Sequence, residues 1–450
     1  MNPSALPRIL PGLRGSRALR WTHTRLGQLQ RTFDKALPQA HRPLTAGFST
    51  SSCVPRKKVM FPGALDSEYT HELRFASNVE SIPTYQVMDT DGKVLDAAND
   101  PQVTEEEARK IYKNMHVLNV MDQIMYEAQR QGRISFYMTN FGEEALIGSA
   151  AALDPRDQVF GQYREAGVLL QRGFTIQQFM DQCYSNEKDL GKGRQMPIHY
   201  GTKELHFQTI SSPLATQIPQ AAGAAYAMRR EGKKLCAMCY FGEGAASEGD
   251  FHAGLNMAAT IGCPVIFFCR NNGYSISTPS IEQYRGDGIA SRGIGYGIDT
   301  IRVDGNDIWA IYAATKAARK IAVEQNKPIL IEAMTYRISH HSTSDDSSAY
   351  RSKKEVEDWS KRDNPVSRMR AWMESKGWWA KGDDAEITKS AKAEVLKAFT
   401  VAEQLKKPSI QHLFEDVYDE LPLELQREKA EVEALIKKYP DYYQVNEFSK

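Results

Sequence analysis

Two apolar stretches of strand length lie close together near the middle of the chain. The first covers Leu235 to Phe241 and the second Pro264 to Cys269, and between them Phe251 to Ile261 has the spacing of a helix. A strand, a crossover helix and a second strand form a βαβ unit, whose right-handed crossover brings the carboxyl ends of both strands to one edge. The pattern therefore predicts an α/β fold, with a mostly parallel sheet flanked by helices.

Further segments extend this α/β pattern. Thr104 predicts the start of a long helix, because Glu107 three positions later completes a capping box. Apolar side chains recur at helical spacing and mark the face of this helix that we expect to be buried: Ile111, Met115, Leu118, Met121 and Met125. The short apolar runs Val159-Phe160 and 329–333 predict two more strands of the sheet.

Other regions are less regular. Tyr85 to Leu95 predicts either a hairpin that turns at Asp91-Gly92 or an extended arm that needs another surface. Small residues from Ile218 to Met228 predict a helix that packs closely at a helix–helix contact or a subunit interface. Beyond Lys353 the chain is charged and helical, and its tryptophans are the predicted core anchors: Trp359, Trp372, Trp378 and Trp379.

The start of the chain is strongly basic. The first fifty residues carry seven Arg and one Lys against a single acid, Asp34, with Ser and Thr around Phe48. Such composition is typical of a mitochondrial transit peptide, so we expect residues 1–52 to be one and the mature protein to lie in the mitochondrial matrix. The alternative is a disordered basic arm that binds nucleic acid or lipid. Removing this segment's charge of +7 lowers the formal charge from +1 to −6, which offers no electrostatic reason to hold nucleic acid. No apolar run approaches the length of a membrane span.

These patterns divide the chain into parts. After the predicted transit peptide, residues 53–103 form an extended N-terminal arm, 104–355 the α/β domain and 356–450 a helical C-terminal region. Cys236 and Cys239 form a CxxC inside an apolar strand, where the two side chains face opposite sides, and no second ligand pair accompanies them. We interpret the six cysteines as buried thiols in a reducing compartment.

Polar residues follow both strands of the central βαβ unit. Glu243, between Gly242 and Gly244, follows the first strand, and Asn272 follows the second. We expect the two side chains to lie side by side at the edge where open parallel sheets bind ligands. A carboxylate and an amide oxygen suit Mg²⁺, and the glycines let a phosphate approach the backbone. The alternative is an ordinary strand-to-helix turn.

Two other segments carry candidate site residues near strand ends. Tyr163 and Arg164 follow Val159-Phe160, and a planar guanidinium suits a diphosphate; the alternative is a surface arginine. The turn from Ser211 to Gln217 clusters hydroxyl and carbonyl groups that could hold a monovalent cation. The alternative there is a capped helix start.

Two histidines precede a polar segment. His340 and His341 are candidate acids, bases or phosphate contacts, and the alternative is a solvated pair. From Ser342 to Ser348 there is no apolar side chain. This composition predicts a loop with little to hold it.

Several long motifs together resemble one family. They are GQYREAG, GKGRQMPIHYG, ISSPLATQIPQA, GEGAASEGDFHAGLNMAA, FFCRNNGYSIST, QYRGDGIASRG and YRISHHSTSDDSSAYRS. They resemble the alpha subunit of the branched-chain 2-oxo acid dehydrogenase decarboxylase component, from about Ile82 to the C-terminal end. The general thiamine diphosphate motif pairs Gly-Asp-Gly with a later Asn-Asn, and this chain has Glu243 in place of the Asp.

The resemblance implies a thiamine diphosphate-binding fold and a set of site residues. Mg²⁺ would bind Glu243, Asn272 and the main-chain oxygen of Tyr274. The cofactor would contact Gln162, Tyr163, Arg164, Ser212, Leu214, Gly244, Ala245, Arg270 and His341, with Ser212 and Leu214 on the thiazolium side. K⁺ would bind Ser211, Pro213, Thr216 and Gln217. Ser342 and Ser352 correspond to serines that are phosphorylated to switch the enzyme off.

The resemblance also implies a reaction and partners. Thiamine diphosphate would supply the carbanion for decarboxylation of branched-chain 2-oxo acids such as 3-methyl-2-oxobutanoate, and the acyl group would pass to a lipoyl group on an acyltransferase core. His341 is our candidate for the proton donor beside the departing lipoyl sulfur. The family forms a heterotetramer of two alpha and two beta chains, in which a beta-chain Glu activates the cofactor. A regulatory kinase and phosphatase complete the set of partners.

Two alternatives stand beside this interpretation. The pyruvate dehydrogenase alpha subunit shares the fold and the cofactor, but its pattern has Gly-Asp-Gly and a His-Gly-His-Ser-Met-Ser-Asp loop. This chain has Glu243 between its glycines and His340-His341-Ser342-Thr343-Ser344-Asp345 in the loop. A non-catalytic scaffold or regulatory subunit is expected to lack Glu243, Asn272 or His341, and all three are present.

Overall fold

The computed structural model of the chain describes residues 70–76, 80–380 and 382–449. The predicted transit peptide, residues 1–52, lies outside this part, as do residues 53–69 and 77–79 of the predicted arm. Residues 70–76 belong to a first unit that ends at Ser77, and they carry neither helix nor strand. The second unit, Asn78–Lys450, contains the fold.

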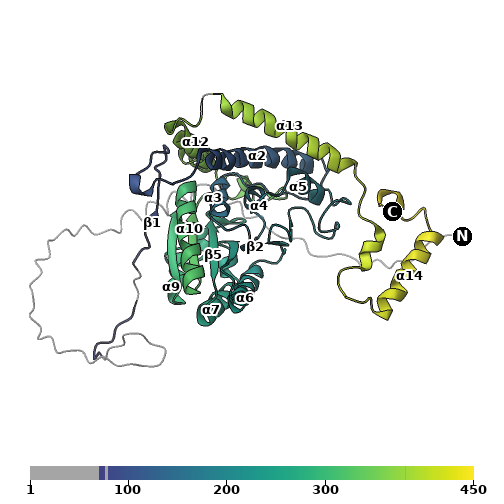
Figure 1. Cartoon of the computed structure of the whole chain (residues 1–450), viewed down its shortest axis with the longest axis horizontal. Coiled ribbons are helices and arrows are strands. Elements are labelled where there is room, and N and C mark those ends of the chain that lie inside the picture. Colours follow the sequence, from purple (N-terminus) through teal and green to yellow (C-terminus); the bar gives the residue numbers. More distant parts are fainter. Residues whose placement is uncertain (1–69, 77–79, 381, 450) are drawn as a thin grey trace, which may run out of the picture. The chain divides into compact units, whose positions relative to one another are not determined.

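The centre of this unit is a seven-stranded sheet in which all neighbouring strands pair in parallel. Its strands follow the order β1 (Thr84–Tyr85), β8 (Asp299–Asp304), β9 (Ile329–Met334), β5 (Val265–Asn271), β4 (Ala237–Gly242), β2 (Gln158–Phe160) and β3 (Phe207–Gln208). Figure 1 labels β1, β5 and β2 among these strands. An antiparallel pair, β6 (Tyr274–Ser275) and β7 (Thr278–Pro279), follows β5. The predicted βαβ unit is confirmed as β4, helix α7 (Gly249–Ile261) and β5.

Alternate residues of the central strands face two different cores. Tyr240 and Phe268 pack with one group of helices: α2 (Glu105–Arg130), α3 (Ile147–Ala151), α4 (Ala166–Arg172), α5 (Ile176–Cys183) and α10 (Ile308–Gln325). Phe241 and Phe267 pack with α6 (Gln217–Arg230) and α7 on the opposite face. Because both faces are covered, the positions from Ala237 to Phe241 in β4 and from Val265 to Cys269 in β5 need apolar side chains, which explains these unbroken apolar runs.

The cysteines follow the same alternation. Cys236 belongs to the first core and Cys239 to the second, so the two thiols lie on opposite faces of the sheet as predicted. The five cysteines among the described residues are all buried and free. Burial raises the pKa of both Cys236 and Cys239, which makes them inert as nucleophiles.

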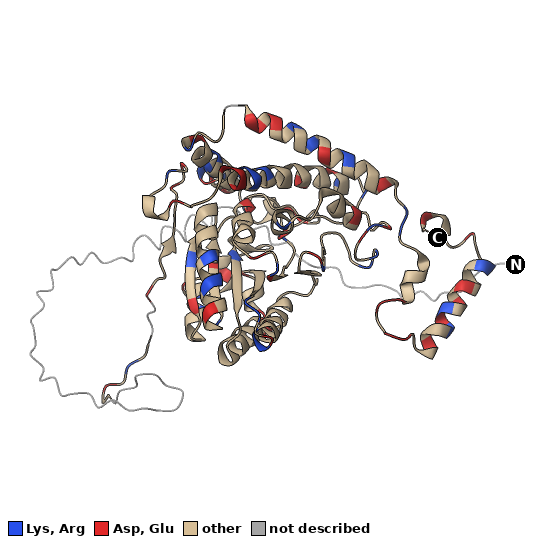
Figure 2. Cartoon of the chain, viewed as in Figure 1, with Lys and Arg blue, Asp and Glu red and all other residues tan. Residues whose placement is uncertain are grey.

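The predicted long helix is α2, and its capping box is formed. Thr104 Oγ1 accepts the Glu107 main-chain N–H at 3.2 Å, and the Glu107 carboxylate accepts the Thr104 N–H at 2.9 Å. All five apolar residues predicted for its inner face are buried. Helix α13 (Asp383–Gln404) packs along α2, and acidic and basic residues alternate on its exposed side (Figure 2).

Part of the N-terminal stretch joins the sheet. After β1 the chain turns at Asp91-Gly92, and the Leu95 N–H donates to the Val87 carbonyl oxygen at 2.9 Å. The N–H groups of Val87 and Met88 donate to Asp307 Oδ2 at 2.7 and 2.6 Å. Of the two alternatives for this stretch, the hairpin is the one that the chain adopts.

The C-terminal region is helical. Its helices are α11 (Lys353–Arg362), α12 (Pro365–Ser375), α13 and α14 (Leu423–Lys438), and none of the α14 side chains is buried. Trp372 and Trp379 are buried as predicted, and Trp359 stacks on Tyr336 with ring centroids 5.0 Å apart. In the described part of the chain, no helix combines the length and apolar character that crossing a membrane requires.

Candidate active site

Segments that follow three neighbouring strands meet at the carboxyl edge of the sheet. Glu243 follows β4 and Asn272 follows β5, and the Asn272 main-chain N–H donates to Glu243 Oε2 at 3.4 Å. After β9, the Thr335 N–H donates to the carbonyl oxygen of Asn271 at 2.8 Å. The structure therefore brings Glu243 and Asn272 together, as the crossover predicts.

Glu243 is a buried carboxyl group with one unused oxygen. It is 1% exposed, and burial, together with the charge of nearby Glu143, raises its pKa to about 7. Its Oε1 is buried and has no hydrogen-bond partner among the described residues. Because an unpaired buried carboxylate oxygen is costly, this atom is suited to a cation.

The atoms around Glu243 define the kind of cation. Asn272 Oδ1 accepts the Tyr274 main-chain N–H at a long 3.3 Å, and the Tyr274 carbonyl oxygen lies 3.5 Å from Arg337 Nη1. Among the described residues, no three His, Cys, Asp or Glu side chains form a metal cluster. A cation at this edge therefore relies on one carboxylate with amide and main-chain oxygens, which is a ligand set that suits Mg²⁺.

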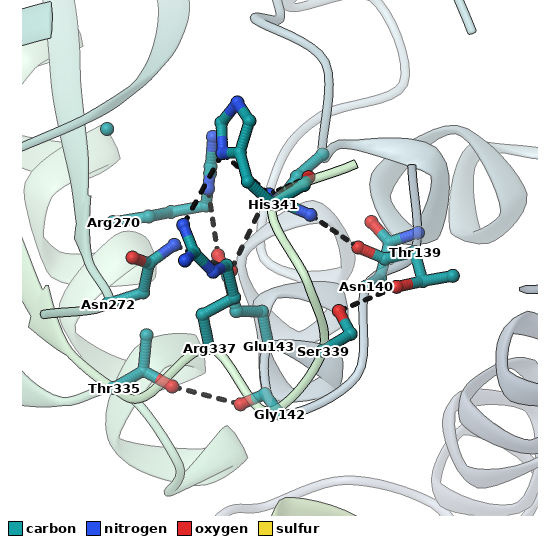
Figure 3. A network of polar contacts seen from close by, with 12 residues as sticks. Thr139, Asn140, Gly142, Glu143, Arg270, Asn272, Thr335, Arg337, Ser339 and His341 are labelled. Carbon is teal, nitrogen blue, oxygen red and sulfur yellow. Dashed lines mark hydrogen bonds and ion pairs between the residues drawn. The ribbon is translucent and has the colours of Figure 1, made fainter. Parts of the chain in front are cut away.

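Arg270, near the end of β5, lies close to Asn272 and Glu143 (Figure 3). It is 2% exposed, and its Nε and Nη1 donate to Glu165 and Glu143, each at 2.8 Å. Its Nη2 is buried without a hydrogen-bond partner in the described part of the chain. A fixed guanidinium with one free N–H group suits an anionic oxygen such as that of a diphosphate.

Arg164 and Arg337 converge on His341. Arg164 Nη2 donates to the His341 carbonyl oxygen at 2.6 Å and lies 3.3 Å from its Nδ1, while Arg337 Nη1 lies 3.4 Å from the same nitrogen. Burial and the two guanidinium groups lower the pKa of His341 to about 3. Since Nδ1 faces two donors, we assign the proton of this neutral imidazole to Nε2. The Tyr163 ring contacts it edge-on, with centroids 5.8 Å apart.

Hydrogen bonds hold the segment after His341 in place. The Thr343 N–H donates to the Tyr137 carbonyl oxygen at 3.0 Å, and the Tyr137 N–H donates to Thr343 Oγ1 at 3.1 Å. The His341 N–H donates to Asp345 Oδ2 at 2.7 Å. The prediction of a loop with little to hold it is wrong, because these hydrogen bonds take the place of the missing apolar contacts.

The two predicted phosphorylation sites differ in their surroundings. Ser342 is 9% exposed, and its Oγ accepts the Ser344 N–H at 3.2 Å. Ser352 is exposed and caps helix α11 by accepting the Glu355 N–H at 3.1 Å. Of the two histidines, His340 bonds within the loop, where its Nδ1 accepts the Ser347 N–H at 2.9 Å. His341 is therefore the histidine that contacts Arg164 and Arg337.

The turn before α6 lies beside β4. Gln217 Nε2 donates to the Tyr240 carbonyl oxygen at 2.9 Å. Thr216 Oγ1 donates to the Pro213 carbonyl oxygen at 3.1 Å and does not cap the helix. The side chains at the tip of the turn are exposed: Ser211, Ser212, Pro213 and Leu214. The structure thus brings the predicted cation-binding residues into one turn.

The remaining predicted cofactor contacts surround the end of β4. Gln162 Oε1 accepts the Gly242 N–H at 2.8 Å. Gly244 has no room for a side chain, because a Cβ there would lie 2.5 Å from Ser275 Oγ. Ala245 is buried directly after it. These residues shape a backbone surface next to Glu243.

Three charged residues of this site are not among those predicted from sequence: Glu143, Glu165 and Arg337. Glu165 lies inside the motif GQYREAG and Arg337 inside YRISHH. Glu165 could have been predicted, because a buried Arg270 needs an acidic partner. Glu143 has no such signal, since its partners Arg270 and Asn272 are 127 and 129 positions away.

Comparison with known proteins identifies the family of this chain. A model of the dehydrogenase E1 component family matches residues 112–411, and the chain belongs to this family. Similar proteins named 2-oxoisovalerate dehydrogenase subunit alpha, mitochondrial, come from Macaca fascicularis, with 58% identity over 87% of this chain and 89% of the relative, and from Homo sapiens, with 57% identity over the same shares. An Arabidopsis thaliana protein named 2-oxoisovalerate dehydrogenase subunit alpha 2, mitochondrial, is 51% identical over 85% of this chain and 82% of its own length. The family resemblance predicted from the motifs is confirmed.

Proposed function

We propose that this chain is the alpha subunit of a mitochondrial, thiamine diphosphate-dependent 3-methyl-2-oxobutanoate dehydrogenase. The enzyme decarboxylates branched-chain 2-oxo acids and passes the acyl group to the lipoyl group of an acyltransferase core. One observation carries the proposal. Among the described residues, a buried carboxyl oxygen, Glu243 Oε1, and a buried guanidinium nitrogen, Arg270 Nη2, lack hydrogen-bond partners at the same edge of the sheet. A divalent cation bound to a diphosphate satisfies both atoms.

The metal of this site is Mg²⁺, held by Glu243, Asn272 and the main-chain oxygen of Tyr274. Glu243 must be ionised to bind a cation, and its pKa of about 7 keeps that form accessible near neutral pH. The contacts to the diphosphate and its surroundings come from Gln162, Tyr163, Arg164, Gly244, Ala245, Arg270 and His341.

When bound, thiamine diphosphate supplies a carbanion to attack the 2-oxo carbonyl and an electron acceptor for the loss of CO₂. The part of this chain is to fix the diphosphate end. Arg164 and Arg270 are already held by protein acceptors, so they need little reorganisation to meet the anion. We assign His341 Nε2–H as the hydrogen-bond donor to the departing lipoyl sulfur, because its Nδ1 is turned to the two arginines.

The turn before α6 serves the other side of the cofactor. Ser212 and Leu214 are exposed there and line the thiazolium side. K⁺ binds Ser211, Pro213, Thr216 and Gln217 and orders the turn. The support is that these residues share one turn, and Gln217 ties it to β4.

The active assembly contains two alpha and two beta chains, and a Glu of the beta chain activates the aminopyrimidine ring. A kinase and a phosphatase act at Ser342 and Ser352. Residues 1–52 direct the protein to the mitochondrial matrix, 53–103 form an N-terminal arm, 104–355 the cofactor-binding domain and 356–450 the helical region.

The test is CO₂ release by the chain alone, the beta chain alone and the mixture, with saturating thiamine diphosphate and Mg²⁺. We expect turnover of 3-methyl-2-oxobutanoate only by the mixture, at a rate well above that with pyruvate. Equal turnover by the isolated chain contradicts the shared site, and a preference for pyruvate contradicts the substrate class.

A further inference from the structure

Glu143 enters the site from a segment that is locked against the loop leading to His341. Thr335 Oγ1 donates to the Gly142 carbonyl oxygen at 2.9 Å. Gly142 has φ of +93°, and a Cβ there would lie 2.3 Å from the Tyr336 carbonyl oxygen, so only glycine fits. This turn directs the Glu143 side chain, 4% exposed, toward Arg270 and Asn272 (Figure 3).

The Glu143 carboxylate thereby contacts both a proposed metal ligand, Asn272, and a proposed diphosphate contact, Arg270. Glu143 Oε2 accepts Arg270 Nη1–H at 2.8 Å, and Oε1 accepts Asn272 Nδ2–H at 2.8 Å. Arg164 Nε lies 3.7 Å from the same Oε1. Both oxygens of the Glu143 carboxyl group therefore face N–H donors, and two guanidinium groups lie beside it.

The acceptor oxygens of Glu143 determine which way the Asn272 amide faces. Glu143 Oε1 accepts a hydrogen bond from Asn272 Nδ2, so the NH₂ group faces Glu143 and Oδ1 is directed elsewhere. A reversed amide would place oxygen against oxygen at Glu143. In this orientation Asn272 Oδ1 has only a long contact with the Tyr274 main-chain N–H, at 3.3 Å, so it is the amide atom available to a cation that binds Glu243.

We propose that Glu143 is a positioning residue that fixes the Asn272 amide with its oxygen toward the cation and holds Arg270 and Arg164 for the diphosphate. The inference rests on the proposed function. It adds a residue that contacts neither the metal nor the substrate and that links the metal ligand to the anion site. Residues that orient metal ligands in this way affect metal affinity strongly.

The test is a calorimetric titration of Mg²⁺ into the two-subunit enzyme with saturating thiamine diphosphate. Glu143→Gln keeps the shape, but its amide offers only one acceptor oxygen, so either Asn272 or Arg270 meets an NH₂ group. We expect the Mg²⁺ affinity to fall about 10- to 100-fold. Asp157→Asn is the matched control, because the buried Asp157 pairs with the partly exposed Arg319 at 2.6 Å ahead of β2, away from this edge.

A double variant distinguishes a positioning role of Glu143 from a role in packing alone. Asn272→Asp alone sets two carboxylates against each other, whereas Glu143→Gln with Asn272→Asp restores a donor facing an acceptor. We expect the double variant to bind Mg²⁺ more tightly than the two single effects predict by addition. Additive effects, or an equal loss of affinity in Asp157→Asn, overturn the proposal. If the parent enzyme does not bind Mg²⁺ with the cofactor at all, the proposed function itself fails.

Discussion

The two edges of the sheet both bury ion pairs, but they differ in what is left unpaired. Ahead of β2, Asp157 binds Arg319 at 2.6 Å and accepts the Cys236 N–H at 3.1 Å, and Arg172 nearby donates to the carbonyl oxygens of Pro155 and Leu205. None of these side chains has a buried polar atom without a partner among the described residues. At the carboxyl edge, by contrast, several do: Glu243 Oε1, Arg270 Nη2, Ser275 Oγ and Arg337 Nε.

The difference separates a structural charge cluster from a binding site. Folded chains pair nearly all their buried polar groups, because each unpaired one costs free energy. At the amino edge the chain satisfies Asp157 by itself, so that cluster can only stabilise the fold. At the carboxyl edge the unpaired atoms suit the proposed ligand, which carries both positive and negative charge. Changes at the two edges should therefore separate stability from cofactor binding.

The largest effect is expected for Glu243→Ala. This change removes the only carboxylate proposed as a metal ligand and leaves Asn272 as the single side-chain ligand. We expect affinity for thiamine diphosphate in the presence of Mg²⁺ to fall by more than about 100-fold, with the circular dichroism spectrum unchanged. The measurement is a cofactor titration of the reconstituted two-subunit enzyme, and a parent-like curve means that the metal assignment is wrong.

A second change tests the loop that closes this edge. Ser342→Glu places a carboxylate beside His341, close to the proposed diphosphate, where Ser342 has little exposure. Like-charge repulsion and crowding should loosen the Thr343–Tyr137 and His341–Asp345 bonds, as a phosphate would. We expect overall complex activity, with the lipoyl-bearing acyltransferase as acceptor, to fall at least about tenfold. Ser348→Glu, at an exposed position of the same loop, is the control. Normal activity of Ser342→Glu contradicts the idea.

A change at the amino edge of the sheet should lower stability and leave cofactor binding unchanged. Asp157→Asn weakens the ion pair with Arg319, and we expect the free energy of unfolding to fall by about 2 kcal/mol, since Arg319 keeps some contact with water. Urea denaturation followed by tryptophan fluorescence measures this. The cofactor titration should match that of the parent. If Asp157→Asn instead binds the cofactor more weakly and keeps the stability of the parent, the purely structural role assigned to Asp157 is wrong.

The last effect, which reaches its full size only across two pH units, concerns an acid behind the carboxyl edge. Burial raises the pKa of Asp122 to about 7, although Asn140 and Tyr137 donate hydrogen bonds to it. Because the folded-state pKa lies above the unfolded value of 3.8, Asp122 adds stability that is fully present below about pH 4 and is lost as the pH rises through about 7. The stability of the parent relative to Asp122→Asn should therefore decline between pH 5 and 7, by about 1 kcal/mol per pH unit. Urea unfolding of both at several pH values checks this, and a difference independent of pH argues against it.

How far the sequence predicts this molecule depends on the range of each interaction. Periodic burial is a local signal, so the βαβ unit and the inner face of α2 could be predicted from Leu235 to Cys269 and from the residues after Thr104. Glu243 and Asn272 could be placed together because a crossover has only one usual hand.

Other features depend on contacts that no local pattern encodes. Glu143 meets Asn272 across 129 positions, and its sequence neighbours form no motif of their own. The loop after His341 lacks apolar residues, but Thr343 and Asp345 hold it through hydrogen bonds whose partners only the fold supplies. Polar anchoring of this kind has no periodicity, which is why the sequence alone predicts a weakly held segment there.

The most direct test of the whole account is a crystal structure of the two-subunit enzyme with Mg²⁺ and thiamine diphosphate. We expect Glu243 Oε1 and Asn272 Oδ1 to bind the metal at about 2.1 Å, with Arg270 Nη2 donating to a diphosphate oxygen. A cofactor bound away from the carboxyl edge, or bound there while Glu243 Oε1 and Arg270 Nη2 keep no partner, would contradict the claim that these unpaired atoms mark its site.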